Sequence, residues 1–397
     1  MIGCAVFFCA LFAAMAAYLC IYIPSHSEEL FNNSYNSRQS VLAQQNTRGT
    51  IYSADGEVLA ETVNVDGEEV RQYPYENMFS HIVGYSTRGK TGLESLANYD
   101  LINTSASASE QAQNAAAGVK NPGNNLVTTL DVTLQEAAYN AMGLYEGAIV
   151  VMEPSTGKIL AMVSKPDFDP NEIAQEWENL NQEGSSVLLN RASQGLYPPG
   201  STFKMITALE YIRGHPDDWE NYTWQCSGSY THGDTTIRCY HGSSHGSLDF
   251  MHSFAESCNS SFANIGMSLE RSSFLSTLDG LLFNQELPVD ISYSRSSVAL
   301  TEDSGDADMI QTVIGQGKTQ MTPLHLCMIT SAIANDGVLM KPYEMDRIEK
   351  PDGTVLKQYE PEEYGRLMTS EEAEILEKLM TDVVEEGTAT KLSGLSY

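Results

Sequence analysis

An uncharged apolar run at the N-terminus constrains this chain more than any other feature. No charged side chain occurs from Ile2 to Ile23. A helix of that length, at about 1.5 Å rise per residue, crosses a hydrocarbon core of roughly 30 Å. The apolar stretch of a cleaved signal peptide is normally shorter and ends in small residues, whereas this run ends in bulky side chains before Pro24. We therefore expect an uncleaved transmembrane anchor over residues 1–23.

The charge balance limits what the rest of the chain binds. The 397 residues carry 52 acidic and 22 basic side chains, a formal net charge of −30, and 42% of them are hydrophobic. Such an acidic surface repels phosphate backbones, so we expect no nucleic-acid partner. The length and hydrophobic content allow two or three folding units with buried cores. No lysine or arginine precedes the apolar run, so the positive-inside signal is missing and the run alone leaves the orientation open.

Turn signals and a polar segment organise the first part of the chain. Asp55-Gly56 predicts a turn between two short strands within residues 48–60. A second ordered segment is expected over about 73–101. Residues 103–125 are rich in Ser, Ala, Gln, Asn and Gly, which predicts a flexible connector and a domain boundary. We expect a small β-rich domain with its linker over residues 24–124.

Strands and helices alternate in the second part of the chain. An extended segment is expected over residues 125–131 and a helix over 134–144. Two short apolar runs joined by Pro-Ser-Thr-Gly predict a hairpin of strands at 148–152 and 158–164. The composition of the first strand indicates burial on both faces. The second part is therefore mixed α and β.

A capped helix is predicted near the end of the sequence. Thr369 and Glu372 fit a capping box, and an apolar stripe at helical spacing follows them. Gly387 stands where this helix should end.

The segment from Tyr197 to Lys204, Tyr-Pro-Pro-Gly-Ser-Thr-Phe-Lys, carries the strongest chemical signal. The prolines and glycine favour a tight turn, and apolar residues then follow at helical spacing. Ser201 is expected at the start of this helix, with Lys204 one turn later on the same face. A serine hydroxyl needs a base to become a good nucleophile, and a lysine whose pKa is lowered by desolvation can be that base. The bare S-x-x-K pattern also occurs on capped surface helices, but the Pro-Pro-Gly sequence before it favours catalysis.

Ser257-Cys258-Asn259 is a second candidate motif. A serine and an asparagine two residues apart can point into one cleft from a loop between helices. Ser257 can relay a proton, and the amide of Asn259 can hold a substrate carbonyl or the catalytic lysine. Taken alone, the tripeptide is equally consistent with an ordinary helix cap.

Together the two motifs resemble those of the penicillin-recognising serine transferases, in which S-x-x-K, S-x-N and K-T-G follow in this order. From about Arg48 to the C-terminus, further short blocks are similar to class B penicillin-binding proteins. These blocks are Arg48-Gly49, Asp55-Gly56, Leu59-Ala60, Gly84-Tyr85, Gly89, Gly92-Leu93-Glu94, Leu130-Asp131, Leu134-Gln135, Thr156-Gly157, Phe168-Asp169-Pro170-Asn171, Gly315-Gln316-Gly317 and Thr322-Pro323.

The resemblance implies an α+β protein with a transmembrane helix, a β-rich pedestal domain and a transpeptidase head of serine β-lactamase-like fold over residues 125–397. It implies a peptidoglycan D,D-transpeptidase in which Ser201 attacks a D-Ala-D-Ala bond and Lys204 is the base. Ser257 and Asn259 then move protons and bind substrate, and an amine of a neighbouring stem peptide resolves the acyl-enzyme. The expected partners are stem peptides, β-lactams that acylate the same serine, the cell membrane and a glycosyltransferase. The bulk of the chain is expected outside the cytoplasm, and no cofactor is implied.

The third family motif falls outside this sequence. By the resemblance, the K-T-G strand follows the helix that ends near Gly387, and the sequence reaches Tyr397 first. Lys90-Thr91-Gly92 lies ahead of the nucleophile, and Lys318-Thr319-Gln320 lacks the glycine. We therefore expect an incomplete head. A chain that ends at Tyr397 is expected neither to bind penicillin covalently nor to fold stably in its C-terminal half.

Four of the seven cysteines lie outside the apolar run. Cys226 and Cys239 form the natural candidate for a disulfide in an oxidising compartment. With His241 and His245 they also have ligand-type spacing for zinc. The spacing is loose and the loop is polar, so we favour a disulfide or two plain thiols and expect no metal site.

Two other functions stay open. A β-lactamase or β-lactam receptor of the same superfamily uses the same motifs, although a lactamase needs efficient water activation and seldom needs a long pedestal on an anchor. A non-catalytic scaffold of the wall-synthesis machinery is the third hypothesis. The rate at which a penicillin adduct is hydrolysed separates a lactamase from a transpeptidase.

Overall fold

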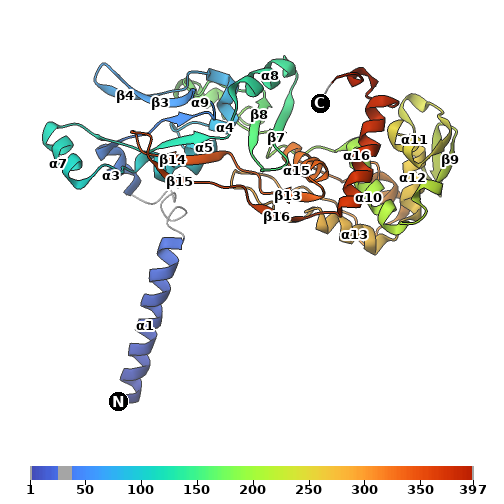
Figure 1. Cartoon of the computed structure of the whole chain (residues 1–397), viewed down its shortest axis with the longest axis horizontal. Helices are drawn as coiled ribbons and strands as arrows, with labels where there is room; N and C mark the ends of the chain where they lie inside the picture. Colours follow the sequence, from blue (N-terminus) through green and yellow to red (C-terminus); the bar gives the residue numbers. More distant parts are fainter. Residues whose placement is uncertain (1, 26–37, 396–397) are drawn as a thin grey trace. The chain divides into compact units, whose positions relative to one another are not determined.

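The computed structural model describes residues 2–25 and 38–395 (Figure 1). Its contacts divide the chain into two compact units, each assembled from separate stretches of sequence. The expected linear limits, 24–124 and 125–397, remain a prediction, and residues 26–37 of the first range lie outside the described residues. The first unit comprises Met1–Val132, Asp167–Ser185 and Met345–Tyr359; the second comprises Thr133–Pro166, Ser186–Glu344 and Glu360–Tyr397.

Helix α1 (Ile2–Ser25) takes up the N-terminal apolar run. Its segment Ile2–Tyr22 has a mean hydropathy of 2.4, and none of it is buried inside the protein. Among the described residues it is the one helix that is long and apolar enough to cross a membrane, judged by length and composition. The helix therefore fits a single-pass membrane anchor.

A six-stranded sheet in the order β15-β14-β6-β2-β3-β4 forms the centre of the first unit. β2 and β3 pair antiparallel on either side of Asp55-Gly56, which confirms the predicted turn. β6 runs parallel to β2, and β14 pairs antiparallel with β6 although it comes from late in the chain. The strands are β2 (Ile51–Tyr52), β3 (Val58–Val65), β4 (Glu68–Gln72), β6 (Asn125–Thr128), β14 (Met345–Glu349) and β15 (Val355–Gln358).

The expected connector over residues 103–125 is instead largely regular structure. It contains helix α7 (Ala108–Ala117), in which Ser107 and Glu110 form a capping box. No residue of α7 is buried, so the helix has no apolar stripe for sequence periodicity to reveal, and it depends on alanine-rich composition and its cap. The other small elements of this unit are α3 (Arg38–Gln45), β1 (Asn46–Thr47), η1 (Glu76–Phe79), α4 (Ser80–Val83), α5 (Gly92–Leu96), α6 (Asn98–Ile102), β5 (Asn121–Pro122) and α9 (Ile173–Leu180).

The predicted hairpin is present in the second unit. β7 (Gly147–Met152) and β8 (Ile159–Lys165) pair antiparallel as a two-stranded sheet, and α8 (Val132–Met142) confirms the helix expected before them. The prediction that the first strand is buried on both faces is wrong, because β7 is half-buried except at Met152. Among the described residues β7 pairs with β8 as its one strand neighbour.

Helices make up most of the rest of the second unit. Figure 1 shows α16, in red, near α10 and α11. The capping box predicted at Thr369 and Glu372 is present, and α16 ends just before Gly387. The helices are α10 (Lys204–Gly214), α11 (Phe250–Ala255), α12 (Asn259–Ser268), α13 (Arg271–Gly280), α14 (Asp306–Thr312), α15 (Pro323–Ala334) and α16 (Ser370–Glu385), with 3-10 turns η2 (Gly200–Phe203), η3 (Trp219–Asn221), η4 (Tyr240–Gly242) and η5 (Thr390–Leu392). Short strands are β9 (Thr223–Cys226), β10 (Ser229–His232), β11 (Thr235–Arg238), β12 (Gly246–Asp249), β13 (Val338–Met340) and β16 (Glu363–Arg366).

Candidate active site

Ser201 lies in the 3-10 turn η2, which leads directly into α10. Pro198 and Pro199 restrict the backbone ahead of this turn, and Gly200 adopts a positive φ of 60°. The serine side chain is exposed, whereas α10 is buried from Lys204 to Ile212. The buried helix therefore anchors an exposed hydroxyl, as the sequence predicts.

The Gly315 loop holds the serine turn in place. The Gly200 N–H donates to the Gly315 carbonyl at 2.9 Å, and the Thr207 hydroxyl donates to the Val313 carbonyl at 2.8 Å. Gly315 has φ +67°, and a Cβ atom at this position would lie 2.2 Å from the Gly200 carbonyl oxygen. The contact excludes a side chain, which gives a physical reason for glycine at 315.

Gly315→Ala is therefore expected to destabilise the second unit. The left-handed backbone alone costs an L-residue roughly 1–2 kcal/mol, and the Cβ contact with the Gly200 backbone adds to that cost. A thermal melt should show a clear fall in the unfolding midpoint. Gly305→Ala is the matched control, since a Cβ at Gly305 meets nothing within 4 Å. Equal midpoints for the two variants would contradict the assigned packing.

The amine of Lys204 lies at the centre of the site. Its side chain is only 2% exposed. Nζ is 3.3 Å from Ser201 Oγ and 2.9 Å from Ser257 Oγ, and it donates to the Asn259 Oδ1 at 2.7 Å. It also donates to the Ser257 carbonyl at 2.6 Å. The four residues that the sequence singles out are thus brought together around one amine.

Burial changes the acid–base behaviour of this amine. Desolvation by burial lowers the pKa of Lys204 to about 8. The ring of Phe262, 5.5 Å from Nζ, contributes to the apolar surroundings. A lysine whose pKa lies near neutrality can accept a proton, which an exposed lysine does rarely.

Ser257 lies on the turn between α11 and α12, and Asn259 is the first residue of α12. Ser257 adopts a positive φ of 51°, which is uncommon for a residue with a side chain and marks local strain. The Asn259 side chain donates from Nδ2 to the Arg238 carbonyl at 3.1 Å while its Oδ1 accepts from Lys204. The asparagine therefore holds the lysine amine.

A cavity of about 250 Å³ opens beside these groups. One wall comes from the C-terminal part of α16, and the Thr388 N–H donates to the Ala255 carbonyl at 3.1 Å, which joins that segment to the end of α11. The sequence predicts α16 as a capped amphipathic helix, but periodicity does not indicate which cavity the helix borders. The lining residues are Ser201, Thr202, Lys204, Met205, Phe254, Ser257, Met380, Val383 and Thr388.

An exposed serine, a buried lysine one turn later and a facing S-x-N turn are the arrangement expected of a penicillin-recognising serine acyltransferase. Family comparison gives the same class. Residues 147–396 match the penicillin binding protein transpeptidase domain, and residues 48–126 match the penicillin binding protein A dimerisation domain.

Named relatives and solved structures cover most of the chain. The peptidoglycan D,D-transpeptidase PbpA of Mycolicibacterium smegmatis is 30% identical over 87% of this chain and 74% of its own length. Penicillin-binding protein A of M. tuberculosis, solved as an imipenem acyl-enzyme complex, superposes with a TM-score of 0.79 at 27% identity, over 86% of this chain and 83% of that one. The D,D-transpeptidase domain of a peptidoglycan glycosyltransferase from Eggerthella lenta gives a TM-score of 0.79 at 29% identity, over 88% and 84%.

The chain belongs to the class B penicillin-binding proteins and carries their transpeptidase domain. The α+β fold and the enzyme class predicted from the sequence are thereby confirmed.

Proposed function

We propose that this protein is a peptidoglycan D,D-transpeptidase that works through an acyl-enzyme on Ser201. One observation carries the proposal: the buried Lys204 amine lies within 3.3 Å of Ser201 Oγ and 2.9 Å of Ser257 Oγ. Relatives named as D,D-transpeptidases, and a structural neighbour acylated by imipenem, support the substrate class.

The proposed chemistry follows from these distances. Ser201 Oγ attacks the carbonyl carbon of the D-Ala-D-Ala peptide bond while the neutral amine of Lys204 takes the hydroxyl proton. Lys204 returns this proton through the Ser257 hydroxyl to the nitrogen of the departing D-alanine, so the C–N bond breaks and an ester forms on Ser201. Asn259 keeps the lysine amine in place through its Oδ1. An amine of a second stem peptide then attacks the ester carbonyl; a new peptide bond forms, the ester C–O bond breaks, and the proton lost by the amine restores the Ser201 hydroxyl.

The same proposal includes the placement of the protein. α1 anchors the chain in the cell membrane, and the residues after it lie on the extracytoplasmic side, where peptidoglycan stem peptides are found. The stretch over residues 24–124 serves as the pedestal, and residues 125–397 belong to the transpeptidase part. A glycosyltransferase of the wall-synthesis machinery supplies the glycan strands that carry the stem peptides.

Labelling with a fluorescent penicillin tests the function. With the protein as its gene encodes it, in membranes, we expect a single covalent adduct on the peptide that contains Ser201, located by mass spectrometry. The adduct should persist, because a transpeptidase site is built for an amine acceptor rather than for water. Rapid hydrolysis of the adduct would identify a β-lactamase instead. A label on another residue, or no label, would contradict the assignment of Ser201.

A further inference from the structure

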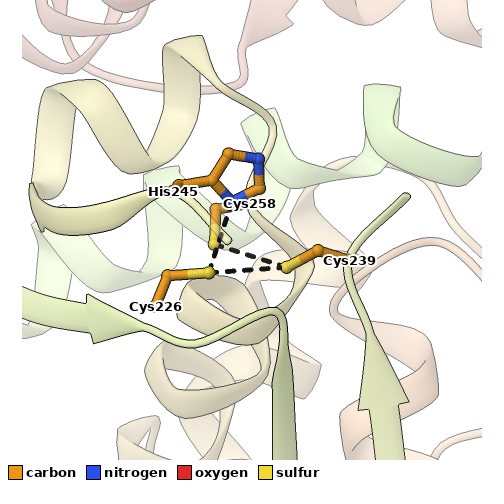
Figure 2. A group of neighbouring side chains, drawn as sticks. All are labelled: Cys226, Cys239, His245 and Cys258. Carbon is orange, nitrogen blue, oxygen red and sulfur yellow. Dashed lines mark hydrogen bonds between the residues drawn. The ribbon is translucent and has the colours of Figure 1, made fainter. Parts of the chain in front are cut away.

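Three cysteines and one histidine converge in the second unit, next to the Ser257 turn (Figure 2). The Cys226 Sγ lies 3.7 Å from the Cys239 Sγ, and the Cys239 Sγ lies 3.7 Å from the Cys258 Sγ. His245 Nδ1 lies 3.3 Å from the Cys226 Sγ. All four atoms are within 4.8 Å of one another, and the three cysteines are buried.

The separations between these atoms match the ligand–ligand distances of a tetrahedral metal site better than the sulfur–sulfur distance of a disulfide. Zinc binds thiolate sulfur at about 2.3 Å and imidazole nitrogen at about 2.0–2.1 Å, so a tetrahedral site has sulfur–sulfur edges of about 3.8 Å and sulfur–nitrogen edges of about 3.5 Å. A disulfide needs sulfur atoms about 2.05 Å apart, and all the described cysteines are free. We propose that Cys226, Cys239, Cys258 and His245 bind one zinc-type divalent cation.

The local fold brings the four ligands together from well-separated positions. β9 ends at Cys226, and its antiparallel pairing with β12 places Gly246 opposite that cysteine, so His245 lies next to it. Cys239 directly follows β11, and its N–H donates to the Gly228 carbonyl at 2.9 Å. Cys258 is the N-cap of α12. The proposed ion therefore joins a small β-rich segment to a helix of the active site.

Hydrogen-bond donors surround the sulfur atoms of the cluster and hold them in place. The Gly228 N–H and the Ser260 hydroxyl donate to the Cys226 Sγ at 3.4 and 3.2 Å, and the Ser261 N–H donates to the Cys258 Sγ at 3.5 Å. Such outer contacts orient metal ligands. A Cβ at Gly228 would lie 2.7 Å from the Gly242 carbonyl oxygen, so glycine permits the close turn after Cys226.

The proposed ion also acts on the catalytic turn. Cys258 is the middle residue of Ser257-Cys258-Asn259, and both neighbours contact the Lys204 amine. A cation bound to the Cys258 Sγ would fix this turn, including the strained backbone of Ser257. Cys258 is then a positioning residue, a role that rests on the proposed function, whereas the metal site itself does not.

Metal analysis tests the site directly. We expect the purified protein, as its gene encodes it, to contain about one zinc ion per chain. Exchange for cobalt should produce thiolate-to-cobalt charge-transfer absorption and the intense visible bands of a tetrahedral ion. This spectrum is measured on the unaltered protein, so it does not depend on how variants fold. Protein without metal, or cobalt bands typical of an octahedral oxygen site, would overturn the proposal.

Substitution of single cysteines tests which residues bind the zinc ion. Cys226→Ser and Cys239→Ser should each weaken zinc binding by at least about 10- to 100-fold. His241→Ala and Cys327→Ser are matched controls and should retain zinc, because neither residue belongs to the cluster. If both serine variants keep the zinc of the parent, the assignment is wrong. An intact mass that shows a Cys226–Cys239 disulfide in the freshly purified protein would also refute it.

A separate experiment tests the positioning role of Cys258. Chelation of the zinc should lower the rate of penicillin acylation by about 100-fold, as expected for a displaced catalytic group, and added zinc should restore it. Unchanged acylation after complete metal loss would refute the positioning role and leave the metal site standing. Acylation that is absent from the zinc-loaded protein would instead contradict the proposed function.

Discussion

Replacing Lys204 with arginine is expected to lower the rate of penicillin acylation by roughly 100- to 10,000-fold, the usual contribution of a general base. The variant keeps the positive charge but loses the proton acceptor, since a guanidinium does not deprotonate in a protein. Burial lowers the pKa of the native lysine to about 8, so a useful fraction of it is neutral near pH 7. The measurement is the second-order rate constant for labelling by a fluorescent penicillin.

Two further variants serve as controls for this experiment. Ser201→Ala should lose the label completely, because it removes the atom that forms the ester. Lys318→Arg should label at the parent rate, since Lys318 is exposed and lies outside the cavity. A thermal melt close to the parent would show that Lys204→Arg is folded. Labelling of that folded variant near the parent rate would mean that another group is the base.

The parts of the site that depend on local sequence could be predicted. The spacing of Ser201 and Lys204, the Pro-Pro-Gly turn and the S-x-N tripeptide each act over a few residues, and the structure brings these groups together. The capping box of α16 and the β7–β8 hairpin could be predicted for the same reason, because each depends on a short stretch of sequence.

Features that depend on long-range pairing could not be predicted. β14 joins the sheet of the first unit beside β6, more than two hundred residues earlier in the chain, and no local pattern specifies that partner. The cysteine cluster shows the same limit. Loop spacing pointed to both His241 and His245 beside Cys226 and Cys239, whereas the structure keeps only His245 in the cluster and adds Cys258, which lies inside another motif. The register of β9 against β12 pairs Gly246 with Cys226 and so places His245 beside that cysteine.

A buried ion-pair cluster connects distant segments of the first unit. Glu94 is fully buried. Its two carboxylate oxygens meet the Nε of Arg48 at 2.6 Å and the Nε of Arg71 at 2.7 Å. Arg48 also donates to the Glu94 carbonyl at 2.6 Å, and Tyr73 donates its hydroxyl to the carboxylate at 3.2 Å. The cluster joins the start of the sheet, β4 and α5 within one unit.

Glu94→Gln is therefore expected to destabilise the first unit by about 3–5 kcal/mol, the usual cost of breaking a buried ion pair. Glutamine has nearly the same shape, so the loss reflects two guanidinium groups left without their anion rather than a cavity. Glu69→Gln is the control, because Glu69 pairs with Lys120 while both side chains remain partly exposed, and such pairs contribute only about 0–1 kcal/mol. Thermal melts and limited proteolysis of the first unit would measure both.

The pH dependence gives this prediction a second readout. Burial by itself would raise the pKa of Glu94, but Arg48 and Arg71 together outweigh burial and hold it below its ordinary value. A carboxylate whose folded-state pKa is depressed stabilises the protein fully above the unfolded pKa of about 4.3, and the stabilisation is lost as the pH falls through the folded pKa. The difference in midpoint between the parent and Glu94→Gln should therefore be constant near neutral pH and narrow in acid. If the difference is absent at pH 7, or grows as the pH is lowered, the ion pairs do not stabilise the unit in the way the geometry indicates.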